Sequence, residues 1–449
     1  MFDESLEDEG ILFYAVIKWL VLSVIAGLLV GGSVGLFLII LYKSIDWVAA
    51  LPDQRYILIP VGLLASLYSI RIFAPAAAGH GTEKVIAAIH YHAAKIPFSV
   101  VPIKILSTLF TLAPGAVVGT EGPSVQIGGG IMSWVARLIR CRTEERKKLV
   151  VCGVAAALSA VFGAPIAGAV FGVEVLFVGE IFYTVLLPAV VSGIIAYFVC
   201  LKLGVPYDIP SVAVPALDMS VLSWCFAAAL FFSLVCIFHI EFMAFIERTF
   251  KKMTVPAWVK SLIASGLILC VVAFSGERFL GMGEKGLVTV LSGHPLIWYA
   301  FIVKSFLLAT TLSGGGSGGV LTPTFYIGAA AGGLFAQIFG LDVGFFGALG
   351  FVGCVAGCVN TPLAATFLAM EMFGSSIAPY AGGVCVICYM LSGHRSLYPT
   401  QILVQPKSSA FVLADPENKQ SWQIRRRKTY LQFPRIFRLS KIKEKTRQK

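Results

Sequence analysis

The sequence is poor in charged residues, and this shortage excludes most classes of soluble protein. Only 13% of the 449 residues are charged, whereas 57% are hydrophobic and the mean hydropathy is +0.86. Because soluble domains carry about 25% charged residues, we expect a polytopic membrane protein. Apolar runs recur between residues 11 and 390. At about 20 residues per crossing, they predict roughly ten or eleven membrane segments.

Two further features are missing. The first ten residues carry five acids, where a cleavable signal peptide would be positively charged. The ten cysteines are scattered through apolar runs, and neither Cys354 with Cys358 nor Cys385 with Cys388 has an activating charged or polar neighbour. We therefore expect small apolar packing, with no disulfide framework, metal site or cofactor.

The charge that is present is distributed unevenly. Residues 425–449 contain eleven Lys or Arg and one Glu, which supply most of the net charge of +11. The positive-inside rule places this tail in the cytoplasm, as a solvated segment or in contact with anionic lipid; nucleic acid is not an expected partner. The chain then divides into an acidic N-terminal segment, 1–10, a transmembrane domain, 11–404, and a basic tail, 405–449.

A glycine-rich break at residues 115–130 interrupts the apolar runs and carries one carboxylate, Glu121. Unpaired backbone groups are costly in lipid, so such a break must be buried in protein or line a wet cavity. Pro123 suits the first turn of a helix. We predict a helix that begins near residues 121–124, with its N-terminal amides forming an anion site inside the protein. The alternative is a kinked structural helix with a snorkelling Glu121, although intramembrane carboxylates are usually functional.

The chain also repeats itself. Residues 101–130 align without a gap with residues 301–330, and the identities include Gly115 with Gly315 and Pro123 with Pro323. Further on, residues 163–174 align with residues 360–371. We infer two homologous halves, at about 20–200 and 220–400. Broken helices at matching places in two halves are typical of transporters whose site lies near the midplane.

The repeat separates shared residues from unique ones. Glu121 aligns with Leu321, so only one half carries an acid at its helix opening. An ionised acid there can occupy the place of a halide among weak donors, and a protonated acid can leave it, which links anion passage to protonation. Four residues shared by the halves are expected to be structural. Glu174 and Glu371 would lie at helix ends or subunit contacts, and Lys104 and Lys304 would bind buried carbonyls or, alternatively, raise the local positive potential.

Two competing classes are less well supported by the sequence. In a membrane enzyme, Glu121 would act with His80 or His90 as acid and base, but no nucleophile motif, metal-ligand set or phosphate loop accompanies them. A cation channel would need an acidic ring or a carbonyl filter. One carboxylate is also too few for a metal-cation cage. The sequence therefore predicts an anion transporter and no enzyme.

Four motifs, in order along the chain, resemble the CLC chloride channel and chloride/proton antiporter family. They are GTEGPSVQIG at 119–128, FGAPIAG at 162–168, GGVLTP at 318–323 and SLY at 396–398. The resemblance covers about residues 20–405. It implies an all-α inverted repeat of tilted and broken helices, assembled as a homodimer with one anion pathway per subunit. The paired cytoplasmic modules of eukaryotic relatives are not found, which favours a prokaryotic member in the cell membrane.

The resemblance also implies a site and a substrate. Glu121 is similar to the external gating and proton-transfer glutamate, and Tyr398 to the central tyrosine whose hydroxyl meets the anion. The implied substrate is chloride, exchanged for protons. The alternatives are a passive chloride channel or an exchanger for another small anion such as fluoride. The other anion-binding residues implied are Gly79, His80, Gly81, Gly122, Val320 and Leu321.

Several positions depart from the family pattern. Val175 occupies the place of the internal proton-transfer glutamate, which favours a channel, and Glu180 is the nearest other carboxylate for a relay. The fluoride-exchanging branch also departs from the family pattern at the position of Gly79-His80-Gly81, but the sequence has no positive match to that branch. The other departures are His80 for serine, Glu83 for proline, Thr120 for arginine and Leu321 for phenylalanine.

Overall fold

The computed structural model describes residues 2–51, 56–207, 210–413 and 424–426. Most of the basic tail predicted for residues 405–449 therefore lies outside the described residues. The described part contains two pairs of short strands, β1 (Phe177–Val178) with β2 (Ile402–Leu403) and β3 (Phe411–Leu413) with β4 (Ile424–Arg426). Its sixteen α-helices are α1 (Phe2–Ala49), α2 (Leu58–Phe73), α3 (Thr82–Tyr91), α4 (Val100–Leu112), α5 (Glu121–Leu138), α6 (Thr143–Phe162), α7 (Pro165–Glu174), α8 (Leu186–Leu203), α9 (Met219–Lys252), α10 (Ala257–Ser275), α11 (Glu284–Leu291), α12 (Ala300–Ser313), α13 (Leu321–Phe339), α14 (Val343–Val359), α15 (Pro362–Phe373) and α16 (Ala378–Leu391).

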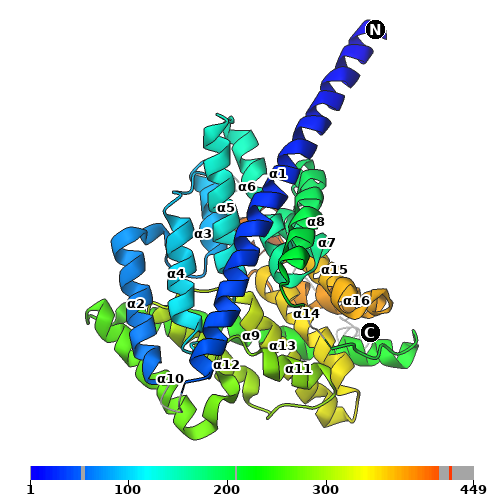
Figure 1. Cartoon of the computed structure of the whole chain (residues 1–449). Coiled ribbons are helices and arrows are strands. Elements are labelled where there is room, and N and C mark those ends of the chain that lie inside the picture. The colour runs from blue at the N-terminus through cyan, green and yellow to red at the C-terminus, as the bar shows by residue number, and fades with distance from the viewer. Residues whose placement is uncertain (1, 52–55, 208–209, 414–423, 427–449) are drawn as a thin grey trace, which may run out of the picture.

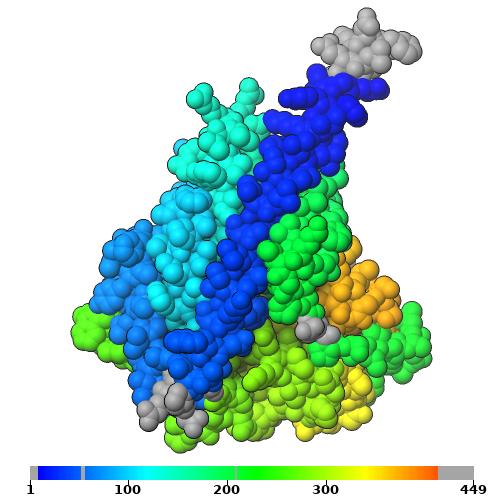
Figure 2. All heavy atoms as spheres, in the orientation of Figure 1, coloured from blue at the N-terminus to red at the C-terminus, as the bar shows by residue number. Residues whose placement is uncertain are grey.

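Helix α1 lies diagonally across the body, and its N-terminal end projects beyond it (Figures 1 and 2). It packs closely against α8 because glycines face that helix. A Cβ on Gly27 would lie 2.7 Å from the Ser192 carbonyl oxygen, and one on Gly31 would lie 2.7 Å from Ala196 Cα. The glycines of the first apolar segment therefore serve helix packing, as small residues do in membrane proteins.

Four helical segments of the described part are long and apolar enough to cross a membrane, whereas roughly ten or eleven segments were predicted. They are residues 9–49, 183–203, 219–252 and 257–279. The remaining apolar helices include seven of only 10–17 residues. The difference arises because many apolar segments are divided into short helices by Gly and Pro, as the interruptions in the sequence indicated.

The same stop and start signals divide the helices in both halves. Helix α6 ends at Gly163, which has φ +64°, and Pro165 opens α7. Helix α14 ends at Asn360, which has φ +60°, and Pro362 opens α15. A residue in the left-handed region ends a helix, and proline is favoured in the first turn of the next. Matching signals therefore give matching helix breaks.

The two halves meet through equivalent residues. Gly119 and Gly319 form an antiparallel bridge, with N–H···O=C distances of 2.8 and 2.7 Å. Equivalent residues that bind each other in this reciprocal way lie on a local two-fold axis. The loops just before them repeat the exchange, through Val117 N–H to Thr311 Oγ1 at 3.2 Å and Ser317 N–H to Thr111 Oγ1 at 3.0 Å. The axis therefore passes between the openings of α5 and α13.

Candidate functional site

Glu121 and Leu321 open α5 and α13 beside the two-fold axis, and the helix start predicted near residues 121–124 is confirmed. The Glu121 side chain is fully buried. Its carboxylate accepts hydrogen bonds from Leu321 N–H at 2.6 Å and from the Thr322 hydroxyl at 2.8 Å, with Thr322 N–H at 3.4 Å. The acid of one half therefore occupies the amide donors at the helix N-terminus of the other half, where an anion is favoured.

The loop that carries Gly79, His80 and Gly81 approaches this junction closely because of its glycines. Gly79 and Gly81 have φ values of +79° and +75°, which favour glycine, and they place His80 just before α3. A Cβ on Gly81 would overlap the Gly122 carbonyl, and a Cβ on Gly122 would overlap the His80 carbonyl. The loop can therefore approach the start of α5 only because both positions lack a side chain.

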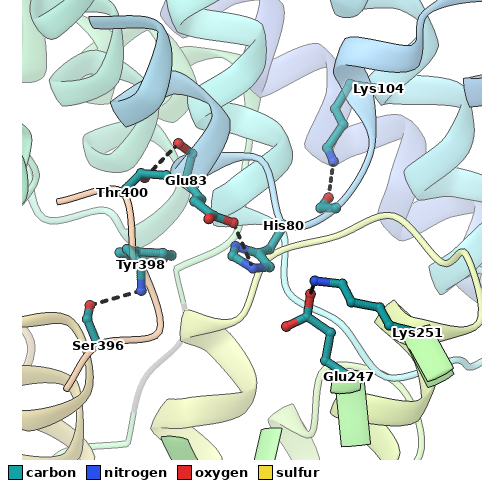
Figure 3. A network of polar contacts seen from close by, with 9 residues as sticks. His80, Glu83, Lys104, Glu247, Lys251, Ser396, Tyr398 and Thr400 are labelled. Carbon is teal, nitrogen blue, oxygen red and sulfur yellow. Dashed lines mark hydrogen bonds and ion pairs between the residues drawn. The ribbon is translucent and has the colours of Figure 1, made fainter. Parts of the chain in front are cut away.

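Lys104 holds the same loop from the other side (Figure 3). Its fully buried Nζ donates to the carbonyl oxygens of Ala77 at 3.0 Å and Gly79 at 2.6 Å. In the second half, Lys304 donates likewise to three carbonyls, at 3.0, 3.5 and 2.8 Å, in the segment before α11. Both lysines thus bind buried carbonyls, as we expected from their presence in both halves.

Three buried polar atoms around this loop have no hydrogen-bond partner among the described residues: His80 Nδ1, Thr82 Oγ1 and Tyr398 Oη. The rings of His80 and Tyr398 lie 6.0 Å apart. Ser396 Oγ accepts the Tyr398 N–H at 2.9 Å, which positions the tyrosine (Figure 3). Because buried polar groups nearly always have partners, these atoms mark a place for a polar ligand.

A cavity of about 610 Å³ leads to this place. Gly79, His80 and Val320 line it together with Glu247 and Lys251 of α9. The side chains of Glu247 and Lys251 form an ion pair at 2.6 Å and are 57% and 72% exposed, so the cavity reaches the protein surface. The cavity therefore connects solvent with the loop that carries His80.

The structure brings the predicted site residues together in two adjoining groups. Glu121, Gly122 and Leu321 lie at the helix junction, and the others lie around the inner end of the cavity: Gly79, His80, Gly81, Val320 and Tyr398. The sequence analysis missed Thr322 and Thr82. Thr322 aligns in the repeat with Gly122, which was a predicted anion-binding residue, so the alignment could have identified Thr322 as well.

The two positions considered for an internal proton relay offer no carboxylate inside the protein. Glu180 is exposed in the loop after β1. Val175 is fully buried, and its carbonyl accepts a hydrogen bond from Gln401 Nε2 at 2.9 Å, so its apolar side chain offers no group for a proton. No group of three or more His, Cys, Asp or Glu side chains in the described ranges is placed to hold a metal ion.

Glu174 and Glu371 form a reciprocal pair between the halves. Glu174 accepts the N–H groups of Leu363 and Ala364, at 3.0 and 2.7 Å, at the start of α15. Glu371 accepts the two equivalent N–H groups at the start of α7, at 2.9 and 2.8 Å. Each acid therefore caps the helix that carries the other, which confirms their expected position at helix ends.

Comparisons with known proteins agree with this geometry. The sequence model described as "Voltage gated chloride channel" matches residues 61–393. A chloride/fluoride channel protein of Pseudomonas syringae pv. tomato is 33% identical over 402 residues, which cover 86% of each chain. The H(+)/Cl(−) exchange transporter ClcA of Salmonella arizonae is 27% identical over 382 residues, which cover 76% of this chain and 79% of ClcA.

Solved structures are similar as well. The crystal structure of a CLC-type fluoride/proton antiporter has a TM-score of 0.82 and 25% identity, and the match covers 87% of this chain and 98% of that chain. A slow cyanobacterial Cl⁻/H⁺ antiporter has a TM-score of 0.72 at 19% identity, with 84% and 94% covered. These matches confirm the predicted fold class. They also include relatives named for fluoride, which the sequence motifs did not indicate.

Proposed function

Because the chain belongs to the voltage gated chloride channel (CLC) family of anion-transporting membrane proteins, we propose that it exchanges halide ions for protons. In this proposal Glu121 is the coupling group. The observation that supports it is the hydrogen bonding of the Glu121 carboxylate to Leu321 N–H and the Thr322 hydroxyl. An ionised carboxylate competes with a halide for these donors. A protonated one is neutral and releases them, so proton binding and halide binding alternate at one place.

We propose that both chloride and fluoride are substrates. The hydroxyls of Thr82 and Tyr398, together with the amide donors at the helix junction, offer short, strong hydrogen bonds to a small anion. The names of two relatives mention fluoride, and those of two others mention chloride and protons. His80, beside Tyr398, is the residue expected to set the preference between the two halides.

A passive halide channel is the second candidate. Val175 favours it, because its side chain offers no proton-binding group. The P. syringae relative is also named a channel. In this alternative Glu121 would only gate the anion pathway, and halide flux would move no protons.

The assembly and location that we propose follow the family pattern. The chain would form a homodimer with one pathway per subunit. It would lie in the cell membrane of a prokaryote, with an acidic segment at 1–10 ahead of the transmembrane domain and the basic tail in the cytoplasm. The tail's excess of Lys and Arg supports this orientation.

The test is reconstitution of the full chain in liposomes loaded with KCl or KF, with halide and proton movements recorded together. An outward halide gradient is expected to drive proton uptake against a proton gradient. In Glu121→Gln, halide flux should persist while proton movement falls by about 100-fold or more, the range typical of a lost proton-transfer group.

Three outcomes would contradict parts of the proposal. Brisk halide flux without proton uptake in the wild type would establish the channel alternative. Unchanged, fully coupled exchange in Glu121→Gln would remove Glu121 from its role. Transport of chloride without fluoride would restrict the substrate to chloride.

A further inference from the structure

The cavity wall carries a second acid that the anion site does not use. Glu83, in the first turn of α3, lines the cavity with its side chain 23% exposed. Its carboxylate lies 3.3 Å from His80 Nε2 (Figure 3). Its backbone carbonyl accepts the hydrogen bond from Thr400 Oγ1, at 3.1 Å. The backbone thus ties Glu83 to the fold, and the carboxylate faces His80 and the cavity.

His80 links this acid to the buried site. One ring nitrogen, Nε2, faces Glu83, while Nδ1 is buried and has no hydrogen-bond partner among the residues described. The His80 backbone packs directly against Gly122, the residue after Glu121. An imidazole can accept a proton at one nitrogen and release one from the other. The ring therefore contacts an acid of the cavity wall, and its backbone contacts the residue that follows Glu121.

Two of the charged groups near this pair have other partners. Lys104 binds the loop carbonyls, and Glu247 is paired with Lys251. Among the described residues, His80 is the group that lies within ion-pair distance of Glu83. The charged groups that face the pair from the surrounding helices are Lys84 of α3, Lys104 of α4, Glu247 and Lys251 of α9, and Lys260 of α10.

We propose that Glu83 and His80 form the proton path between the cavity and Glu121, an inference that rests on the proton-coupled exchange proposed above. A proton from the cavity binds the Glu83 carboxylate and passes to His80 Nε2 as the carboxyl O–H bond breaks. The Nδ1–H bond then breaks, and its proton crosses the anion site to the Glu121 carboxylate. The ring is left as the Nε2–H tautomer, and rotation about its side-chain bonds exchanges the positions of the two nitrogens before the next transfer. One proton moves per cycle, and no other reactant is consumed.

This path lies near Val175, whose buried side chain offers no group for a proton. Thr400 binds the Glu83 carbonyl, and the next residue, Gln401, binds the Val175 carbonyl at 2.9 Å. Glu83 and Val175 are therefore attached to consecutive residues of one segment. An acid in the cavity wall can supply a function that the Val175 side chain cannot.

The test compares two single-charge changes in the same cavity wall, in the full chain reconstituted in liposomes. In Glu83→Gln, the number of protons moved per halide is expected to fall at least about tenfold, because a proton-transfer group is lost. Glu247→Gln removes an equal charge that faces the same pair but does not contact His80, so its coupling should change far less than that of Glu83→Gln. Glu83→Asp keeps a carboxylate and should retain part of the coupling, and Glu83→Ala repeats the test should the glutamine variant fold poorly.

The outcomes separate this inference from the function on which it rests. Full coupling in the wild type and also in Glu83→Gln or Glu83→Ala would overturn the Glu83–His80 path alone. An equal loss of proton coupling in Glu83→Gln and Glu247→Gln would overturn the path as well. The loss would then be caused by the changed charge of the cavity wall and not by the missing contact with His80. Absence of coupling in the wild type would overturn the proposed exchange, and this path with it.

Discussion

In the first half, Lys104 binds the loop that carries Gly79, His80 and Gly81; in the second half, Lys304 binds the loop that carries the Gly281-Met282-Gly283 sequence. Both loops place glycines in the left-handed region, and both lead into a helix. The loops differ in the residue that they present. His80 borders the cavity, whereas Met282 is 7% exposed within the hydrophobic core.

The helix junction repeats this contrast. Residues 121 and 321 open equivalent helices, but one is an acid and the other is leucine. The matched features, such as the Gly119–Gly319 bridge and the reciprocal helix caps, build the scaffold of both halves. The unmatched residues, Glu121 and His80, lie at the candidate site. A duplicated fold thus indicates which residues serve structure and which serve chemistry.

The lysine pair gives the largest expected effect. Removing either ammonium by Lys104→Met or Lys304→Met leaves two or more buried carbonyls without a donor, and should lower the free energy of unfolding by roughly 3 kcal/mol. Only Lys104→Met should also change halide preference, because its loop carries His80. Unfolding by SDS titration and halide flux in liposomes measure the two effects. A change of preference in Lys304→Met as large as that in Lys104→Met would break the distinction between the halves.

The helix caps give a smaller effect that should be equal in both halves. Glu174→Gln and Glu371→Gln each replace a charged acceptor of two N–H groups by a neutral one. Each change should lower the free energy of unfolding by roughly 1–2 kcal/mol. The matched control is Glu180→Gln, an exposed acid with no such role, which should leave stability unchanged. The same SDS titration measures all three variants, and a loss confined to one cap would contradict the reciprocal arrangement.

Much of the scaffold could be predicted from the sequence because backbone geometry is encoded by residue type. Pro165 and Pro362 mark helix starts, and Gly79 and Gly81 mark a turn that only glycine adopts easily. The ungapped repeat added long-range information, since equivalent residues were expected to have equivalent roles. The helix start at Glu121 and the bonding of Lys104 followed from these signals.

The partners of the side chains could not be predicted in the same way, because they depend on tertiary contacts between distant segments. Glu121 binds donors 200 and 201 residues away, at Leu321 and Thr322. The contact of Glu83 with His80 depends on a loop shape that no periodicity encodes. The number of complete membrane crossings was equally hard to predict, since a short apolar helix and half of a broken one look alike in sequence.

The central claim is that Glu121 and a halide compete for the same donors on α13. It is tested most directly by anomalous diffraction from bromide-soaked crystals of the wild type and of Glu121→Ala. We expect a bromide ion within hydrogen-bonding distance of Leu321 N–H in Glu121→Ala, and we expect the Glu121 carboxylate to occupy the same position in the wild type. A Glu121→Ala structure without bromide there, or a wild-type structure with bromide bound there beside the undisplaced carboxylate, would contradict it.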